Sequence, residues 1–167
     1  MAELFPDEIQ AFVKTRIESH PSLAGIPWQL GQGVLIDDGT YPKIPGFEQS
    51  LAIYGLSIIA WTVQGFGVTD VVKTGTAIEL LDIPVVIQEN IKDNQNVNNP
   101  NATQIPALRL MHYIKEAVSG FPKVGHGSSW APILISHEPF EDFGTLNGLR
   151  TVLVRFTKQN RVNPLST

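Results

Sequence analysis

The spacing of apolar residues near the start of the chain predicts an amphipathic helix over roughly residues 6–19. Its apolar stripe is Ile9, Phe12, Val13 and Ile17. Pro6 suits the first turn, and Pro21 prevents the helix from continuing. Its polar positions are Gln10, Lys14 and Glu18. We expect the stripe to be covered by a sheet or a second helix, and the polar face to meet solvent.

A second amphipathic helix is predicted between Pro106 and Gly120, where the same periodicity returns. Its apolar positions are Ala107, Leu110, Met111, Ile114 and Val118. Pro106 suits its first turn, and Gly120 with Pro122 ends it. The two helices are therefore expected to lie on one face of a common sheet.

Between the helices, β-branched and aromatic residues predict strands over residues 34–36, 52–54, 56–63 and 68–78. Residues 64–67 are predicted as a hairpin connection, because Gln64 is followed by Gly65-Phe66-Gly67. A further strand is expected over residues 83–88. Pro84 places its start at a strand end or at a sheet edge, where a missing N–H costs least.

The closing part of the chain predicts an antiparallel pair over residues 133–138 and 149–158. The second strand places Val152, Val154 and Phe156 on one face, and Thr151, Leu153 and Arg155 on the other. The predicted fold class is α+β, with a single mostly antiparallel β-sheet of about five strands and two amphipathic helices packed on one face. Residues 1–160 are expected to form one domain, and residues 161–167 a flexible C-terminal tail.

Residues 90–103 are rich in asparagine and have few side chains suited to a core, which predicts a long loop. Connections of this length are uncommon in compact domains, so we favour a loop that orders against a partner over a tolerated insertion. Residues 38–47 and 138–148 are the other candidate contact segments. The candidate interface residues are Tyr41, Phe47, Asn94, Asn96, Asn98, Asn99, Phe140 and Phe143. The two last either pack under their own loop or anchor a neighbour.

Composition narrows the classes of partner. A chain of 167 residues with 43% hydrophobic and 17% charged residues is typical of one folded domain. The net charge of −4 gives no attraction toward phosphate backbones or anionic lipid, so neither nucleic acid nor a membrane is expected as the main partner. The acidic start lacks the features of a signal peptide, and the apolar stretch 51–63, predicted as buried strand, is too short to span a bilayer.

Chemistry-bearing motifs are sparse. The chain has no cysteine, and its four histidines lack the spacing typical of metal ligands. His126 and the serines after it lie outside a nucleophile-elbow sequence. Residues 31–33 and 65–67 lack the third glycine and the strand-to-helix setting of a phosphate-binding loop. We therefore predict no catalytic residue, cofactor or metal, and a chain that is not an enzyme.

The order of helix, meander, polar break, helix (107–118) and closing strand (149–156) resembles that of the tail terminator and related minor tail or neck proteins of tailed bacteriophages. The resemblance covers the whole chain in organisation and rests on no diagnostic motif. It implies a subunit of a ring, commonly six-fold, that caps the tail tube and offers a surface to the head–tail connector. Self, tail tube protein and connector would then be the partners, and the virion tail, assembled in the bacterial cytoplasm, the location. Residues 38–50 and 90–103 are extra length relative to that family.

Two alternatives remain open at this point. The first is another virion part, such as a neck, head-completion or tube protein. The second is a small α+β enzyme or ligand-binding protein, whose site would be assembled from scattered residues such as His112, His137 and Glu138.

Overall fold

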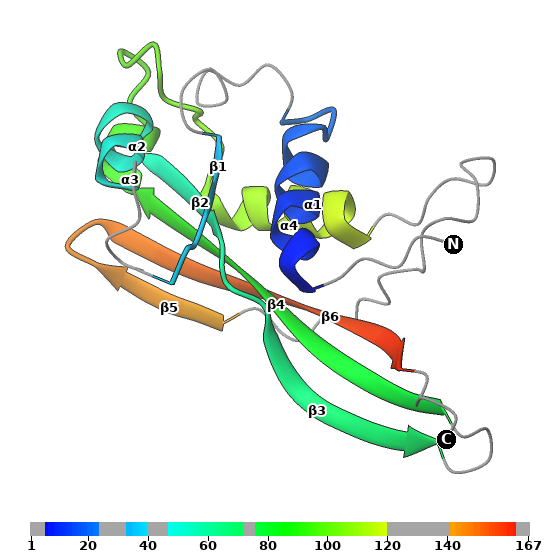
Figure 1. The fold of residues 1–167 in the computed structure, drawn as a ribbon. Coiled ribbons are helices and arrows are strands. Elements are labelled where there is room, and N and C mark those ends of the chain that lie inside the picture. Colours follow the sequence, from blue (N-terminus) through cyan, green and yellow to red (C-terminus); the bar gives the residue numbers. More distant parts are fainter. Residues whose placement is uncertain (1–5, 24–32, 40–46, 72–75, 120–140, 163–167) are drawn as a thin grey trace.

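The computed structural model describes residues 6–23, 33–39, 47–71, 76–119 and 141–162. These residues form four helices and one six-stranded sheet (Figure 1). The α+β fold class is confirmed, with six strands where about five were expected. The strands are β1 (Val34–Ile36), β2 (Leu56–Ala60), β3 (Gln64–Val71), β4 (Thr76–Asn90), β5 (Glu141–Leu146) and β6 (Leu149–Val162).

The strands are arranged in the order β1-β2-β4-β6-β5, with β3 also paired to β4. The β1–β2 pair is parallel and the other pairs are antiparallel, so the sheet is mostly antiparallel as expected. β4 and β6 form the longest ladder, from Ala77↔Val162 to Asn90↔Leu149. β6 therefore includes the first two residues of the expected tail. The C-terminal residues 163–167 lie outside the described part of the chain.

β2 and β3 lie one after the other along the same edge of β4. β2 pairs with residues 85–89 of β4, and β3 pairs with residues 76–82. Residues 64–67 are thus part of β3, with a register shift between Gly65 and Gly67, and the expected hairpin connection there is wrong. The expected single strand 68–78 is also wrong, because residues 68–71 belong to β3 and residues 76–78 to β4, two antiparallel strands in which Val71 pairs with Thr76. The β-branched residues of both strands made them look like one strand in the sequence.

Pro84 lies inside the long β4, paired with Arg155 of β6, so the first of its two predicted positions, a strand end, is wrong. Its carbonyl accepts a hydrogen bond of 3.0 Å from Trp61 N. The N–H and C=O of one strand residue point to the same side of the strand, so the side of Pro84 that lacks an N–H faces residues 61–63. These residues lie between the end of β2 and the start of β3. Proline is therefore tolerated in a central strand at a point that is locally an edge.

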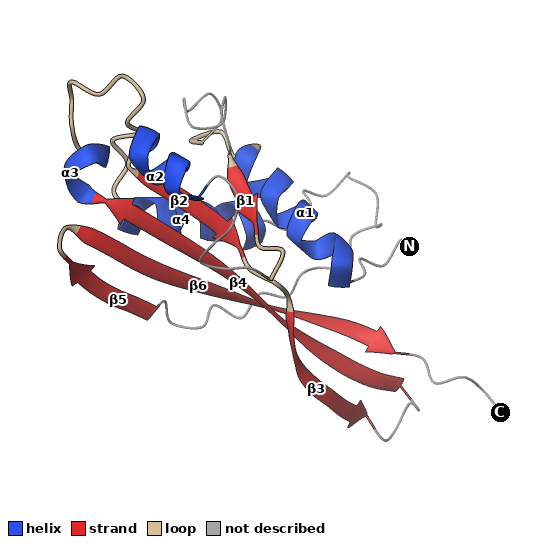
Figure 2. Ribbon diagram, turned by 60° about the vertical axis from the view of Figure 1, so that its left-hand side comes forward, coloured by secondary structure: helices blue, strands red, loops and turns tan. Residues whose placement is uncertain are grey.

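The helices are α1 (Pro6–Glu18), α2 (Phe47–Tyr54), α3 (Ile91–Asn94) and α4 (Ala107–Ser119). α1 and α4 cover one face of the sheet, as expected, and α2 and α3 lie together near one end of it (Figure 2). The main core between the helices and the sheet includes Ile9, Val13, Ile17, Leu110, Ile114, Val152, Val154 and Phe156. On the opposite face, Leu35, Ile59, Val86 and Leu153 form a smaller cluster beside Trp61. The alternation predicted for β6 is therefore confirmed.

Residues 52–54 belong to α2, so the strand expected there is wrong. Within α2, Ser50 and Tyr54 are buried four residues apart, whereas Ala52 and Ile53 are exposed. The Ser50 hydroxyl donates to the Leu56 carbonyl (2.8 Å), and Gly55 follows the helix with a φ of +68°. A glycine in this conformation is a common helix terminator, and it outweighs the local preference of Ile53 and Tyr54 for a strand.

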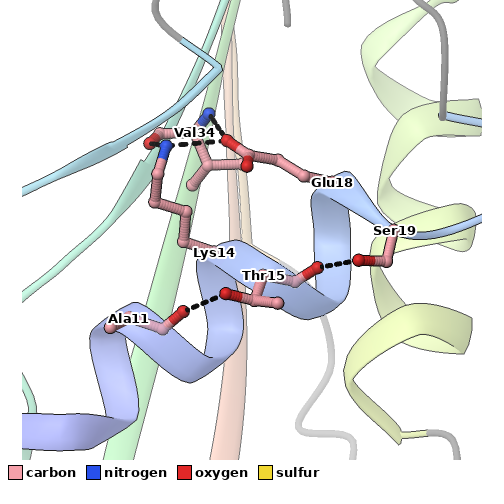
Figure 3. A network of polar contacts seen from close by, with 6 residues as sticks. All are labelled: Ala11, Lys14, Thr15, Glu18, Ser19 and Val34. Atoms are coloured by element: carbon pink, nitrogen blue, oxygen red, sulfur yellow. Dashed lines mark hydrogen bonds and ion pairs between the residues drawn. The ribbon is translucent and has the colours of Figure 1, made fainter.

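The polar face of α1 lies against the sheet and is only partly exposed, so the expectation of a fully solvated face is wrong. Gln10 Nε2 donates to the carbonyls of Asp37 (2.9 Å) and Ala60 (3.1 Å). Lys14 and Glu18 bond to the backbone of β1 (Figure 3). Sequence periodicity separated polar from apolar positions correctly, but it does not show that a polar stripe is matched by the backbone of a strand.

Candidate functional site

Asn94, expected as an interface residue, is fully buried at the end of α3. Its Nδ2 donates to Glu89 Oε1 (2.7 Å) and to the Ile105 carbonyl (2.8 Å). Its Oδ1 accepts from the Thr103 hydroxyl (2.6 Å). The side chain therefore has no surface to offer a partner, and the prediction for Asn94 is wrong.

Glu89 joins the same network from the end of β4, and its side chain is almost wholly buried. Besides Asn94, its Oε1 accepts from Gln95 Nε2 (3.1 Å), and its Oε2 accepts from Ala107 N (3.0 Å) at the start of α4. A carboxylate at the positive end of a helix is electrostatically favourable, and three donors compensate for its lost hydration. This network ties β4, α3 and α4 together and has a structural role.

The rest of the asparagine-rich segment is held mainly by its own side chains. Asn90 accepts from Asp93 N (3.4 Å) and caps α3, and Asn96 and Asn99 each accept from a backbone N–H two residues ahead (3.0 Å). Asn99 Nδ2 also donates to the Ile53 carbonyl of α2 (3.2 Å). The segment begins with a helix and orders against its own chain, which corrects the expectation of a continuous loop. Asn96 and Asn98 are exposed, and their contact role stays a prediction.

The structure describes only some of the aromatic residues predicted to form an interface. Tyr41 and Phe140 lie outside the described residues, as do His137 and Glu138 and the expected strand 133–138. Phe47 begins α2, and Phe143 lies in β5, so the segment 138–148 contains a strand that was not expected. Asn147 and Gly148 connect β5 to β6 with φ values of +53° and +78°. An Asn-Gly pair between strands is a strong hairpin signal, and it was the available clue to β5.

A three-stranded part of the sheet extends beyond the helices. It consists of β3, residues 76–82 of β4 and residues 157–162 of β6, and we call it the β-extension (Figures 1 and 2). Among the described residues, β3 pairs only with β4, and β6 has β4 as its one partner beyond Leu153. Within the described part of the chain, the β-extension thus presents two different strand edges, one on each side of β4. Such edges are suited to pairing with another chain.

Exposed apolar side chains occur at the other end of the sheet. Those near α2, α3 and the β5–β6 turn are Ile53, Val97, Leu108 and Leu149. Val97 is the most exposed of them, at 77%. Singly exposed apolar residues are common on protein surfaces, so these four residues do not by themselves define a binding site.

A cluster of ionisable side chains joins α4 to the residues that follow α1. Glu116 Oε2 accepts a hydrogen bond from His20 Nε2 (3.0 Å). Glu116 Oε1 lies 3.1 Å from His112 Nε2. The His20 ring stacks on Tyr113, with 5.5 Å between ring centroids. His112 and Glu116 are exposed on the surface. This geometry attaches the residues that follow α1 to α4. Because His137 and Glu138 lie outside the described residues, a site that they would form with His112 stays a prediction.

We expect Glu116→Gln to lower the free energy of unfolding by less than about 1 kcal/mol, because the Glu116 side chain, shared by both pairs, is 48% exposed and solvent screens its interactions. Urea denaturation would measure the change. Arg109→Gln, at an exposed position of the same helix, is a suitable control for loss of one charge. A loss well above that of the control and above 1 kcal/mol would show that the pairs carry more of the α1–α4 contact than their exposure indicates.

The described residues contain no group of three or more histidines or acids placed to hold a metal ion. Among the described helices, none has both the length and the apolar character needed to cross a bilayer. No model of a known protein family matches the chain. No curated protein sequence matches it significantly.

Proposed function

We propose that the chain is a structural subunit of a bacteriophage or prophage tail, acting as a tail terminator or tail-completion ring at the end of the tail tube. The observation that carries the proposal is the β-extension, with its two different strand edges lying beyond the helix-covered part of the sheet. Strand edges of this kind are normally shortened or covered in proteins that remain monomeric. Their presence supports a chain that associates with copies of itself.

A closed ring requires that one surface of each subunit meets a different surface of the next. The edges of β3 and β6 meet this requirement, because they lie on opposite sides of β4. β3 and β6 are both antiparallel to β4 and therefore run in the same direction. The edge of β3 in one subunit can pair with the edge of β6 in the next, and repetition of this contact with a constant rotation closes a ring.

In this proposal the ring joins the tail tube protein to the head–tail connector in the virion tail. The two ends of the subunit differ, since the β-extension lies at one end and the exposed apolar residues near α2 and α3 lie at the other. A ring built from such subunits has two unlike faces, which suits a position between two different proteins. A neck or tube protein would use the same edges, and co-purification with the tube protein or with the connector would separate these roles.

Light scattering over a range of protein concentration tests the ring. We expect the intact chain to form a discrete oligomer. A variant in which residues 69–78 are replaced by Asn-Gly removes the three outermost β3–β4 pairs, from Thr69↔Ile78 to Val71↔Thr76. The buried core residues of β4 lie within residues 81–90, which this variant keeps, so it is expected to fold. Without the outer part of the β-extension, it is expected to have the mass of a monomer.

Val97→Ser, at the opposite end of the molecule, is the matched control and is expected to keep the mass of the intact chain. An intact chain that stays monomeric at high concentration would refute the ring. An oligomer that survives this shortening would refute the outer part of the β-extension, residues 69–78, as its contact surface.

A further inference from the structure

Among the described strands, β1 is the outermost on its side of the sheet, with β2 as its partner. In a strand, alternate residues direct their backbone polar groups to opposite sides. Asp37 N donates to the Ala60 carbonyl on the β2 side (3.0 Å), so Val34 and Ile36 direct theirs outward. At this position an added strand from another chain would find its hydrogen-bonding partners.

Two side chains of α1 already occupy the outward groups of Val34. Glu18 Oε1 accepts from Val34 N (2.9 Å), and Lys14 Nζ donates to the Val34 carbonyl (2.6 Å). Figure 3 shows both side chains reaching from one face of α1 to the strand. Lys14 Nζ also donates to Glu18 Oε1 (2.7 Å), so the two side chains hold each other in place.

Gly33 leaves space for this arrangement. A Cβ at residue 33 would overlap the Glu18 carboxylate and would lie 3.3 Å from Lys14 Nζ. The φ of Gly33, +61°, is also one that other residues rarely adopt. The backbone before β1 is therefore shaped to accept the side chains of α1 at close range.

We propose that Lys14 and Glu18 form an edge guard, which closes the β1 edge of the sheet to strands of other chains. They imitate the donor and the acceptor of an added strand, and they fill the position where it would lie. Ile36, the next outward residue, is apolar and 39% exposed, so an unguarded β1 edge would favour association. Strand addition is thereby restricted to other edges of the sheet.

The double variant Lys14→Ala/Glu18→Ala tests the edge guard. Alanine is a good helix former and the apolar stripe of α1 is untouched, so the variant is expected to fold, as checked by circular dichroism. Light scattering is expected to show an apparent mass at least about twice that of the intact chain at equal concentration, as an uncovered edge pairs with another copy. With the sample diluted until this association is lost, hydrogen exchange at the Val34 amide should be faster by roughly tenfold.

Two further variants locate the effect. Adding Ile36→Lys to the double variant places a charge on the β1 edge and should restore the original mass. Glu18→Gln keeps an oxygen that can accept from Val34 N, and it should leave the mass unchanged. The test compares each variant with the intact chain, so its outcome does not depend on whether the intact chain forms a ring. A folded double variant with unchanged mass and unchanged exchange at Val34 would refute the edge guard, and so would association that Ile36→Lys does not reverse.

Discussion

Gly55→Ala is expected to lower the free energy of unfolding by about 3 kcal/mol or more, because it combines backbone strain with overlap of two backbones. Gly55 has a φ of +68°. A Cβ at this residue would lie 2.7 Å from Asn94 Cα and 2.8 Å from the carbonyl carbon of Asp93. Neither backbone atom can move aside without displacing α3. Urea or guanidinium denaturation followed by circular dichroism would measure the loss.

Gly148→Ala separates the two causes. Gly148 has a similar φ, +78°, but a Cβ there would have no atom within 4 Å. This variant should therefore lose about 1 kcal/mol, from the left-handed conformation alone. Equal losses in the two variants would show that α3 moves away from residue 55 at little cost, which would contradict the close packing described here.

Gly55 has this importance because two segments far apart in the sequence meet at it. Asn90 N donates to the Gly55 carbonyl (2.8 Å), immediately before α3 begins. The turn between α2 and β2 is thus packed directly on the start of the asparagine-rich segment. The same end of the molecule includes the bond from Ile91 N to the Gly148 carbonyl (3.0 Å), which attaches the β5–β6 turn.

The sequence alone predicted those helices and strands in which one pattern of apolar and polar residues continues along the element. In α1, Ile9, Val13 and Ile17 are all fully buried, and in β6 the alternating residues Val152 and Val154 belong to the main core. Such patterns are visible locally because one face of the element is buried along its whole length. The class of fold follows from them.

What the sequence did not show depends on contacts between distant segments. Lys14 and Glu18 look like a solvated helix face, and they become an edge guard only because β1 lies beside α1. The β-extension arises because β6 continues beside β4 as far as Val162, which pairs with Ala77, a residue far away in the sequence. Pairing partners of this separation leave no local signal, so the candidate assembly edges could not be predicted.

The exposure of each asparagine was difficult to predict for a different reason, because asparagine occurs in loops, in helix caps and in buried hydrogen-bond networks. Asn96 and Asn98 are exposed as expected, whereas Asn94, only two residues away from Asn96, is fully buried. The distinguishing signal lies in Glu89, a carboxylate at the end of an apolar strand that requires donors nearby. That requirement becomes evident only when the burial of Glu89 is known.

Asn94→Ala should lower the free energy of unfolding by about 3 kcal/mol, because it breaks a buried network and leaves a buried carboxylate with fewer donors. Asn98→Ala, on the exposed part of the same segment, should change it by no more than about 0.5 kcal/mol. Denaturation measures both, and light scattering of each folded variant then tests the predicted contact role of this segment. If Asn98→Ala alters the apparent mass relative to the intact chain while stability is unchanged, the exposed asparagines contact a neighbour. If Asn94→Ala is as stable as the intact chain, the network around Glu89 does not hold α3 and α4 together as its bonds indicate.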